Sequence, residues 1–195
     1  MTSSLFTPIT FRCGAAAKNR LVLAPLTNTQ SHADGRISAA EHRWLERRAD
    51  GGFGVIETCA AHVSEDGKGF DGQLGVWGDH QLPGLRELAG SLAARGALGL
   101  VQLYHGGVRS PAPLTGQQPW SASSFDEPGA DFERPRPATD ADLERVHHDF
   151  VAAALRSRAA GFAGVELHAA HGYLFSQFLS RTMNLRADGW GGALA

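Results

Sequence analysis

One pattern recurs three times along this chain: a helical segment, a glycine, a short apolar run, and a polar residue where the run ends. The apolar runs cover residues 53–57, 97–103 and 162–167, and an earlier run covers residues 20–25. Alternation of helices with short apolar strands is typical of α/β folds with a parallel sheet. The sequence therefore predicts four parallel strands, each apolar enough to be covered on both faces.

Three helices are predicted before the last three strands. The first begins at Ser38, which is spaced from Glu41 as in a capping box, and ends at Asp50 before two glycines. The second begins near Pro83, a residue suited to a first helical turn, and ends at Gly96. The third ends at Gly161. It begins with Thr139 and Asp142. The 3.6-residue spacing places six apolar residues on one face of this helix: Leu143, Val146, Phe150, Val151, Ala154 and Leu155.

The number of units and the chain length together limit the architecture. A complete eight-stranded β/α barrel takes roughly 250 residues, whereas this chain has 195. We expect residues 1–195 to form a single domain that covers about the first four units of a TIM-type (β/α)8 barrel, as the N-terminal portion of a larger protein. Residues 104–138 form a long predicted loop that holds six of the nine prolines, and loops of this length in compact domains are usually functional or mobile.

Composition excludes several classes of partner. Eighteen basic and twenty acidic residues give a net charge of −2, so no global basic field favours nucleic acid or an anionic membrane surface. No stretch approaches the roughly 18 apolar residues of a membrane helix. The two cysteines, Cys13 and Cys59, are too few for a disulfide scaffold. These features predict a soluble, cytoplasmic protein.

Every predicted strand ends in residues that can hydrogen-bond or titrate. In parallel β/α folds these ends meet on one rim, where ligands bind. The residues at or just after the ends of the four runs are, in order, Pro25, Leu26 and Thr27; Glu57, Thr58, Cys59 and Ala60; Gln102, Tyr104 and His105; and His168, His171 and Tyr173. We therefore expect one shared site at this rim.

His168 and His171, in the sequence HAAHGY, are the sharpest signal. Taken alone, such a pair is more often structural than functional. If His105 supplied a third ligand, the pair could bind zinc. Alternatively, two neutral imidazoles can donate hydrogen bonds to a carbonyl oxygen, with Tyr173 behind them as a proton donor. Gln102 either closes a strand end or pairs with the edge of a flat heterocycle.

Several segments resemble the old yellow enzymes, FMN-dependent ene-reductases on an eight-stranded β/α barrel, and especially their bacterial branch. The matching segments, in order, are KNR and LVLAPLT at 18–27, ETCAA at 57–61, GVW at 75–77, VQLYHGG at 101–107, GFAGVELHAAHGYLFSQFLS at 161–180, Asn184, Arg186, Asp188, and WGG at 190–192. The part from 161 to 192 is highly specific. The turn after the first strand would be weak evidence by itself.

The resemblance implies roles for individual residues. The flavin ring would contact Ala24, Pro25, Leu26, Thr27, Ala60, Gln102 and His168. His168 and His171 would hold the carbonyl oxygen of the substrate, and Tyr173 stands at the position of the proton donor. Thr29 stands where many bacterial members place a tyrosine near the substrate. The resemblance implies FMN as cofactor, NADH or NADPH as reductant, and no metal.

Three functions remain open from the sequence. The first is an FMN-dependent oxidoreductase that reduces the C=C bond of a small α,β-unsaturated carbonyl compound. The second is a non-catalytic half-barrel that forms homo-oligomers through the open edges of its first and fourth strands. The third is a metal hydrolase that uses His105, His168 and His171.

Overall fold

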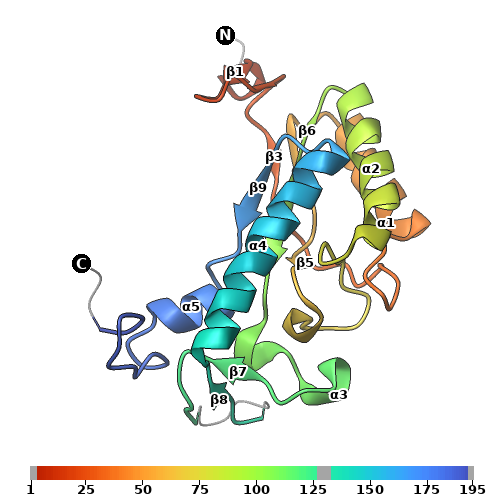
Figure 1. The fold of residues 1–195 in the computed structure, drawn as a ribbon. Coiled ribbons are helices and arrows are strands. Elements are labelled where there is room, and N and C mark those ends of the chain that lie inside the picture. The colour runs from red at the N-terminus through yellow and green to blue at the C-terminus, as the bar shows by residue number, and fades with distance from the viewer. Residues whose placement is uncertain (1–3, 127–132, 193–195) are drawn as a thin grey trace.

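The computed structural model describes residues 4–126 and 133–192, and a parallel sheet with helices packed along it forms its centre (Figure 1). The two ends of the predicted 1–195 domain and the middle of the predicted 104–138 loop lie outside the described residues. No helix of the described segments is long and apolar enough to cross a membrane.

The sheet contains the four predicted strands in the predicted parallel arrangement. Its main strands are β3 (Val22–Leu23), β4 (Val55–Glu57), β6 (Leu98–Tyr104) and β9 (Gly164–Leu167). β4 lies between β3 and β6, and β9 pairs with the other side of β6. A short strand, β5 (Ala61–His62), continues the β4 side of β6. Neighbouring strands in the sheet therefore follow one another along the chain, as the β/α repeat predicts.

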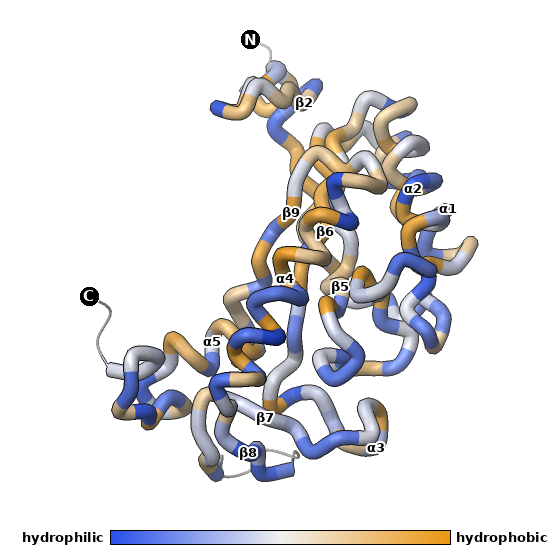
Figure 2. Tube along the Cα trace, viewed as in Figure 1, coloured by the Kyte–Doolittle hydropathy of each residue, from blue (hydrophilic) through white to orange (hydrophobic). Residues whose placement is uncertain are grey.

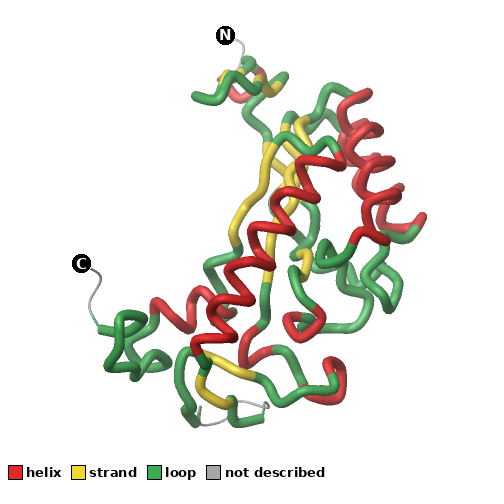
Figure 3. Tube along the Cα trace, in the orientation of Figure 1, coloured by secondary structure: helices red, strands yellow, loops and turns green. Residues whose placement is uncertain are grey.

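The three predicted helices are also present. They are α1 (Ala39–Asp50), α2 (Leu82–Ala94) and α4 (Asp140–Ala160). α2 packs against both α1 and α4, and α4 also contacts β6 and β9. Figure 3 shows the helices beside the strands rather than between them. Each connection runs from a strand through a helix back to the next strand, so the C-terminal ends of the strands share one edge of the sheet.

The predicted capping box at α1 is only half formed. The Ser38 hydroxyl accepts a hydrogen bond from the backbone N–H of Glu41, as expected for an N-cap. The Glu41 carboxylate does not complete the box. It accepts hydrogen bonds instead from Asn28 and Ser31 on the segment that follows β3. Burial against that segment has decided the orientation of the side chain.

The strand register separates an apolar face from a polar face of the sheet. Leu23 pairs with Ile56, and both belong to the hydrophobic core with Val101 and Leu103 of β6. Because side chains alternate along a strand, Gln102 points to the opposite face. Figure 2 shows hydrophobic colour along the central strands. The core therefore lies between the sheet and the helices, and the other face is free to carry polar groups.

The prediction that every strand is covered on both faces is wrong for the outer strands. Val22 of β3, and Val165 and Leu167 of β9, are exposed. The predicted apolar face of α4 is likewise only partly buried, because Val151 and Leu155 are exposed. Burial requires a neighbouring element on each side, and β3 and β9 each have a strand partner on one side only among the described residues.

Smaller elements surround the sheet. The long loop contains η4 (Gly107–Arg109), α3 (Ala112–Thr115), β7 (Trp120–Ser121) and β8 (Arg136–Pro137), so it is more structured than predicted. A short helix, α5 (Leu174–Leu179), follows β9 and packs against β7 and η4. The other elements are η1 (Ser4–Phe6), the antiparallel pair β1 (Ile9–Thr10) and β2 (Ala16–Ala17), η2 (Glu65–Gly67) and η3 (Asp79–Gln81).

Candidate functional site

A cavity of 530 Å³ lies at the C-terminal ends of the strands. Its volume is in the range of small-molecule and cofactor sites. Residues from all four predicted strand ends line it: Ala24, Pro25, Thr27, Ala60, Gln102, Glu166, Leu167, His168, Ala169, Ala170, His171 and Tyr173. The shared rim expected from the sequence is therefore present, with groups from positions 24 to 173 around one space.

His168, His171 and Tyr173 form an aromatic cluster on one wall of this cavity. The ring centroids of the two histidines are 5.2 Å apart, and those of His168 and Tyr173 are 4.8 Å apart. Each pair meets nearly edge to face. The turn that brings them together has His171 in the left-handed region, with φ 56°, followed by Gly172 with φ 70°. The imidazoles thus converge as the HAAHGY sequence suggests.

The structure fixes the hydrogen-bonding form of His168. Its Nδ1 atom accepts a hydrogen bond from the backbone N–H of Ala170, so in the neutral ring the proton is on Nε2. Burial lowers the pKa of His168, and the neighbouring His171 adds to this effect. At neutral pH His168 is therefore an uncharged imidazole that can donate one hydrogen bond from Nε2.

Tyr104 supports this cluster from behind. Its ring lies against Tyr173, with a centroid separation of 4.5 Å, and only 1% of the residue is exposed. A Cβ atom added at Gly69 would lie 2.2 Å from the Tyr104 hydroxyl oxygen, so glycine is required there. Burial raises the pKa of Tyr104 well above its usual value. Tyr104 is a neutral, fixed side chain that holds Tyr173 in place.

Gln102 lies on the polar face of the sheet and also lines the cavity. Its Nε2 atom donates a 2.6 Å hydrogen bond to Glu166. The second N–H of the amide and its carbonyl oxygen remain for a ligand. Near it, the carbonyl oxygen of Ala60 accepts a hydrogen bond from Gln73. This part of the cavity combines the Gln102 amide, which can both donate and accept hydrogen bonds, with small apolar side chains. These groups suit a flat heterocycle.

Two site carboxyls did not stand out in the sequence. In the sequence Glu57 marks the end of one apolar run, and Glu166 lies within another. In the structure Glu166 faces the cavity beside Gln102. Burial raises the pKa of Glu57 to about 7, and Glu166 adds to this rise through a hydrogen bond and its charge. The available signal is the single acidic residue in two of the apolar runs, 53–57 and 162–167.

Two of the expected residues lie away from the cavity lining. Leu26 is exposed, whereas its neighbours Pro25 and Thr27 line the cavity. Thr29 adopts the left-handed conformation with φ 52°, and its hydroxyl donates a hydrogen bond to the Asn28 carbonyl oxygen. The structure thus groups the other predicted site residues but does not bring Leu26 or Thr29 to them.

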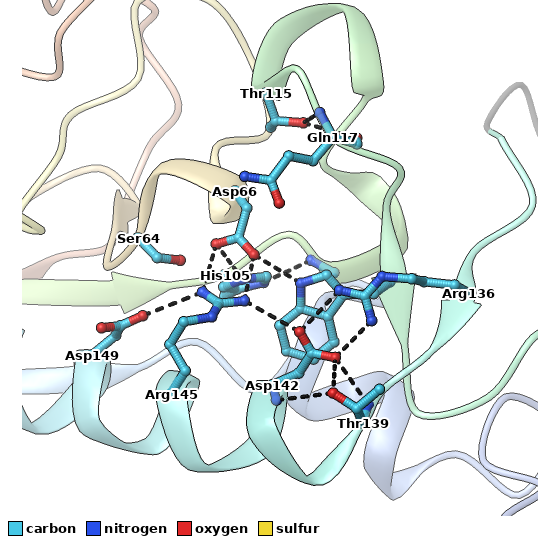
Figure 4. A network of polar contacts seen from close by, with 12 residues as sticks. Ser64, Asp66, His105, Thr115, Gln117, Arg136, Thr139, Asp142, Arg145 and Asp149 are labelled. Carbon is cyan, nitrogen blue, oxygen red and sulfur yellow. Dashed lines mark hydrogen bonds and ion pairs between the residues drawn. The ribbon is translucent and has the colours of Figure 1, made fainter.

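His105 belongs to a separate polar network centred on Asp66 (Figure 4). The His105 Nδ1 atom accepts from the Gly107 N–H, and its Nε2 atom lies 3.6 Å from Asp66. Asp66 also accepts hydrogen bonds from Trp120 and from both terminal nitrogens of Arg145. Burial opposes ionisation of Asp66, but these partners outweigh it and hold the pKa well below its usual range.

This network removes the support for a zinc site. His105 faces Asp66 and Trp120 rather than the two cavity histidines. Among residues 4–126 and 133–192, no group of three His, Cys, Asp or Glu side chains is arranged to hold a metal ion. The described residues therefore give no geometric support to the metal hydrolase alternative.

Comparisons with known proteins identify the family of the chain. The family model described as the NADH:flavin oxidoreductase / NADH oxidase family matches residues 4–195. The chain is 40% identical over 191 residues to the probable NADH-dependent flavin oxidoreductase YqiG of Bacillus subtilis (strain 168). That alignment covers 97% of this chain and 50% of YqiG. It is 38% identical over 176 residues to an NADPH dehydrogenase of Listeria monocytogenes, and this alignment covers 90% of this chain and 51% of that protein.

Solved structures give the same result. The old yellow enzyme homologue from Zymomonas mobilis superposes with a TM-score of 0.91 at 32% identity, over 97% of this chain and 55% of that one. Morphinone reductase in complex with tetrahydroNAD superposes with a TM-score of 0.91 at 29% identity, over 98% of this chain and 56% of that one. The chain spans about half the length of the curated relatives described above.

The match extends over nearly the whole chain, and it includes all the segments that suggested the resemblance. The expected family and fold class are thereby confirmed. The chain belongs to the NADH:flavin oxidoreductase / NADH oxidase family, of old yellow enzyme type, and covers about the first four units of its β/α barrel.

Proposed function

We propose that this protein is an FMN-dependent oxidoreductase that reduces the C=C bond of small α,β-unsaturated carbonyl compounds, with NADH or NADPH as reductant. The chain would contribute the N-terminal half of an FMN-binding barrel as a single domain. The observation that carries the proposal is the single cavity that joins Thr27, Gln102 and His168.

The cavity residues suit a flavin ring. Ala24, Pro25 and Ala60 offer small apolar surfaces to a flat heterocycle. Gln102 offers a carbonyl acceptor and an N–H donor, which match the donor and acceptor edge of a pyrimidine ring. The hydride of the reaction comes from the flavin when that cofactor is bound. The roles of Leu26 and Thr29 at the flavin and the substrate rest on the family likeness alone.

Two cavity histidines would bind and polarise the substrate. His168 donates from Nε2, because its Nδ1 atom is already occupied by the Ala170 N–H. His171 lies 5.2 Å from it, close enough for both rings to reach one carbonyl oxygen. Negative charge grows on that oxygen as hydride arrives at the β-carbon. A donor placed on developing charge is worth about 3 to 4 kcal/mol of barrier lowering.

Tyr173 would complete the reduction by giving a proton to the α-carbon. Its ring is wedged between His168 and Tyr104, so its hydroxyl has a fixed direction. The O–H of a phenol at this position can supply that proton. Tyr104, held by its own burial, keeps the donor from turning away.

The proposal extends to partners and compartment. The exposed apolar residues of β3 and β9 are available for association with another chain, including a second copy. Two free cysteines, Cys13 and Cys59, support a cytoplasmic location. The balanced net charge gives no reason to propose nucleic acid as a partner.

An FMN titration of the purified chain tests the cofactor. We expect the visible flavin bands to shift and the FMN fluorescence to fall on binding. Gln102→Leu should weaken binding by about tenfold, since it removes the amide hydrogen bonds. Gln118→Leu, at an exposed loop position, is the matched control. A chain that leaves the FMN spectrum unchanged at all concentrations would contradict the proposal.

A further inference from the structure

Three polar side chains sit together on the cavity face of the sheet. Glu57 of β4 pairs with Leu100 of β6, and Gln102 follows Leu100 by two residues, so both polar side chains point to the same face. Gln102 in turn pairs with Glu166 of β9. The register alone therefore places two carboxyls on either side of one amide.

The hydrogen bonds of this group are incomplete if both acids are ionised. Gln102 donates one hydrogen bond to Glu166 at 2.6 Å. Glu57 is only 7% exposed, and its buried Oε2 atom has no donor among the described groups. A buried carboxylate without a donor is costly. The side chains of Glu57 and Glu166 are within hydrogen-bond contact. A proton on Glu57 removes this cost, because Glu57 then becomes a donor to Glu166.

We infer that Glu57 and Glu166 share one proton and that this pair fixes which end of the Gln102 amide faces the cavity. The proton resides mainly on Glu57, since Glu166 already accepts a charge-stabilising hydrogen bond from Gln102. The pair then carries one negative charge, on Glu166. Both acids are positioning residues, because they act through Gln102 rather than on a ligand.

A carboxylate accepts hydrogen bonds and does not donate them. It therefore holds the Gln102 amide with Nε2 toward Glu166 and leaves the carbonyl oxygen for the cavity. A glutamine in place of Glu166 would offer both a donor and an acceptor, so the amide could bind in either orientation. The inference rests on the proposed function, because it assumes that Gln102 contacts the flavin.

The surroundings of the pair are simple. Burial and the neighbouring Glu166 raise the pKa of Glu57 to about 7, which agrees with a shared proton. His168, directly after β9, lines the same cavity as Glu166, and the charge of Glu166 acts on it. On the β3 side the neighbouring cavity residue is Ala24, which does not titrate.

Two variants of the full chain separate this arrangement from a general structural role. Glu57→Gln imitates the protonated acid, since its amide can donate to Glu166. Glu166→Gln removes the acceptor that orients Gln102. Glu144→Gln, at an exposed position on α4, is the matched control. Infrared spectra at pH 6 should show the C=O stretch of a protonated carboxyl in wild type and in the control, and not in Glu57→Gln.

FMN affinity provides the second readout. We expect Glu166→Gln to weaken FMN binding by about tenfold and Glu57→Gln by less than about threefold. The side-chain N–H2 signals of Gln102, assigned in NMR spectra by their loss in Gln102→Leu, should move in Glu166→Gln and stay close to wild type in Glu57→Gln. This signal reports the amide orientation without any flavin.

The outcomes separate the inference from the proposed function. Absence of the protonated-carboxyl band in wild type at pH 6 would overturn the shared proton. Equal losses of FMN affinity in the two variants, or unmoved Gln102 signals in Glu166→Gln, would overturn the orienting role. If wild type binds no FMN, the proposed function fails, and the infrared and NMR results still decide the inference.

Discussion

Asp66 and Arg145 are joined by two hydrogen bonds of 3.0 and 2.7 Å although 79 residues separate them in the sequence. Asp66 belongs to η2, after the second strand unit, and Arg145 belongs to α4. Trp120 of the long loop donates to the same carboxylate. One buried carboxylate therefore ties two β/α units and the loop between them.

Asp66→Asn should destabilise the fold by about 2 kcal/mol. The substitution removes the charge that Arg145 and Trp120 share, and the partial exposure of Arg145 makes the loss smaller than for a fully buried pair. Urea unfolding at pH 7 measures it. The control is Asp126→Asn, whose partner Arg134 is also exposed. Equal stabilities of the two variants would refute a central role for Asp66.

The same carboxyl predicts an acid limit of stability. Its pKa is lower in the folded chain than its ordinary value of 3.8, so its contribution is present above that value and is lost as the pH falls below it. Wild type should lose stability over this acid range more steeply than Asp66→Asn. Urea midpoints measured from pH 5 downward give the comparison, and parallel curves would contradict the prediction.

Glu57 predicts a dependence of the opposite sign. Its pKa rises from 4.5 in the unfolded chain to about 7 in the folded chain, so folding favours the protonated form. Its contribution is complete below about pH 4.5 and is lost as the pH rises through about 7. Glu57→Gln should therefore flatten the decline in urea midpoint between pH 5 and pH 8. A decline as steep as in wild type would argue against this.

His171→Ala should weaken the binding of phenols, which imitate the proposed carbonyl substrate, by about tenfold, because one of the two proposed hydrogen-bond donors is lost. FMN binding should change little, since Gln102 and the segment after β3 are intact. Absorption titrations of the FMN-loaded protein with a phenol measure both quantities. Loss of FMN with unchanged phenol affinity would reverse the roles assigned here.

Tyr173→Phe should slow alkene reduction by at least about a hundredfold, since it removes the proposed proton donor. Reduction of the flavin by NADH or NADPH should be spared, because no proton is needed at the α-carbon in that half-reaction. Stopped-flow measurements separate the two halves. Equal slowing of both would indicate that Tyr173 acts through the shape of the site, through its packing on Tyr104 and His168.

The sequence alone determined the parallel β/α order, the three main helices and the strand ends that line the cavity. These features depend on short-range spacing: apolar runs of strand length, helical periodicity, and glycines at helix ends. The proximity of His168, His171 and Tyr173 could likewise be predicted from the sequence, because the three residues lie within six positions and one turn joins them.

Only the tertiary structure decided which residues far apart along the chain meet. The sequence did not indicate that Glu41 would turn away from its own helix cap, that Asp66 would bind Arg145, or that Glu57 and Glu166 would flank Gln102. The predicted burial of Val151 and Leu155 on the apolar face of α4 is also wrong, because both side chains are exposed. Strand register and packing partners set these contacts, and both depend on how whole elements align rather than on any local pattern.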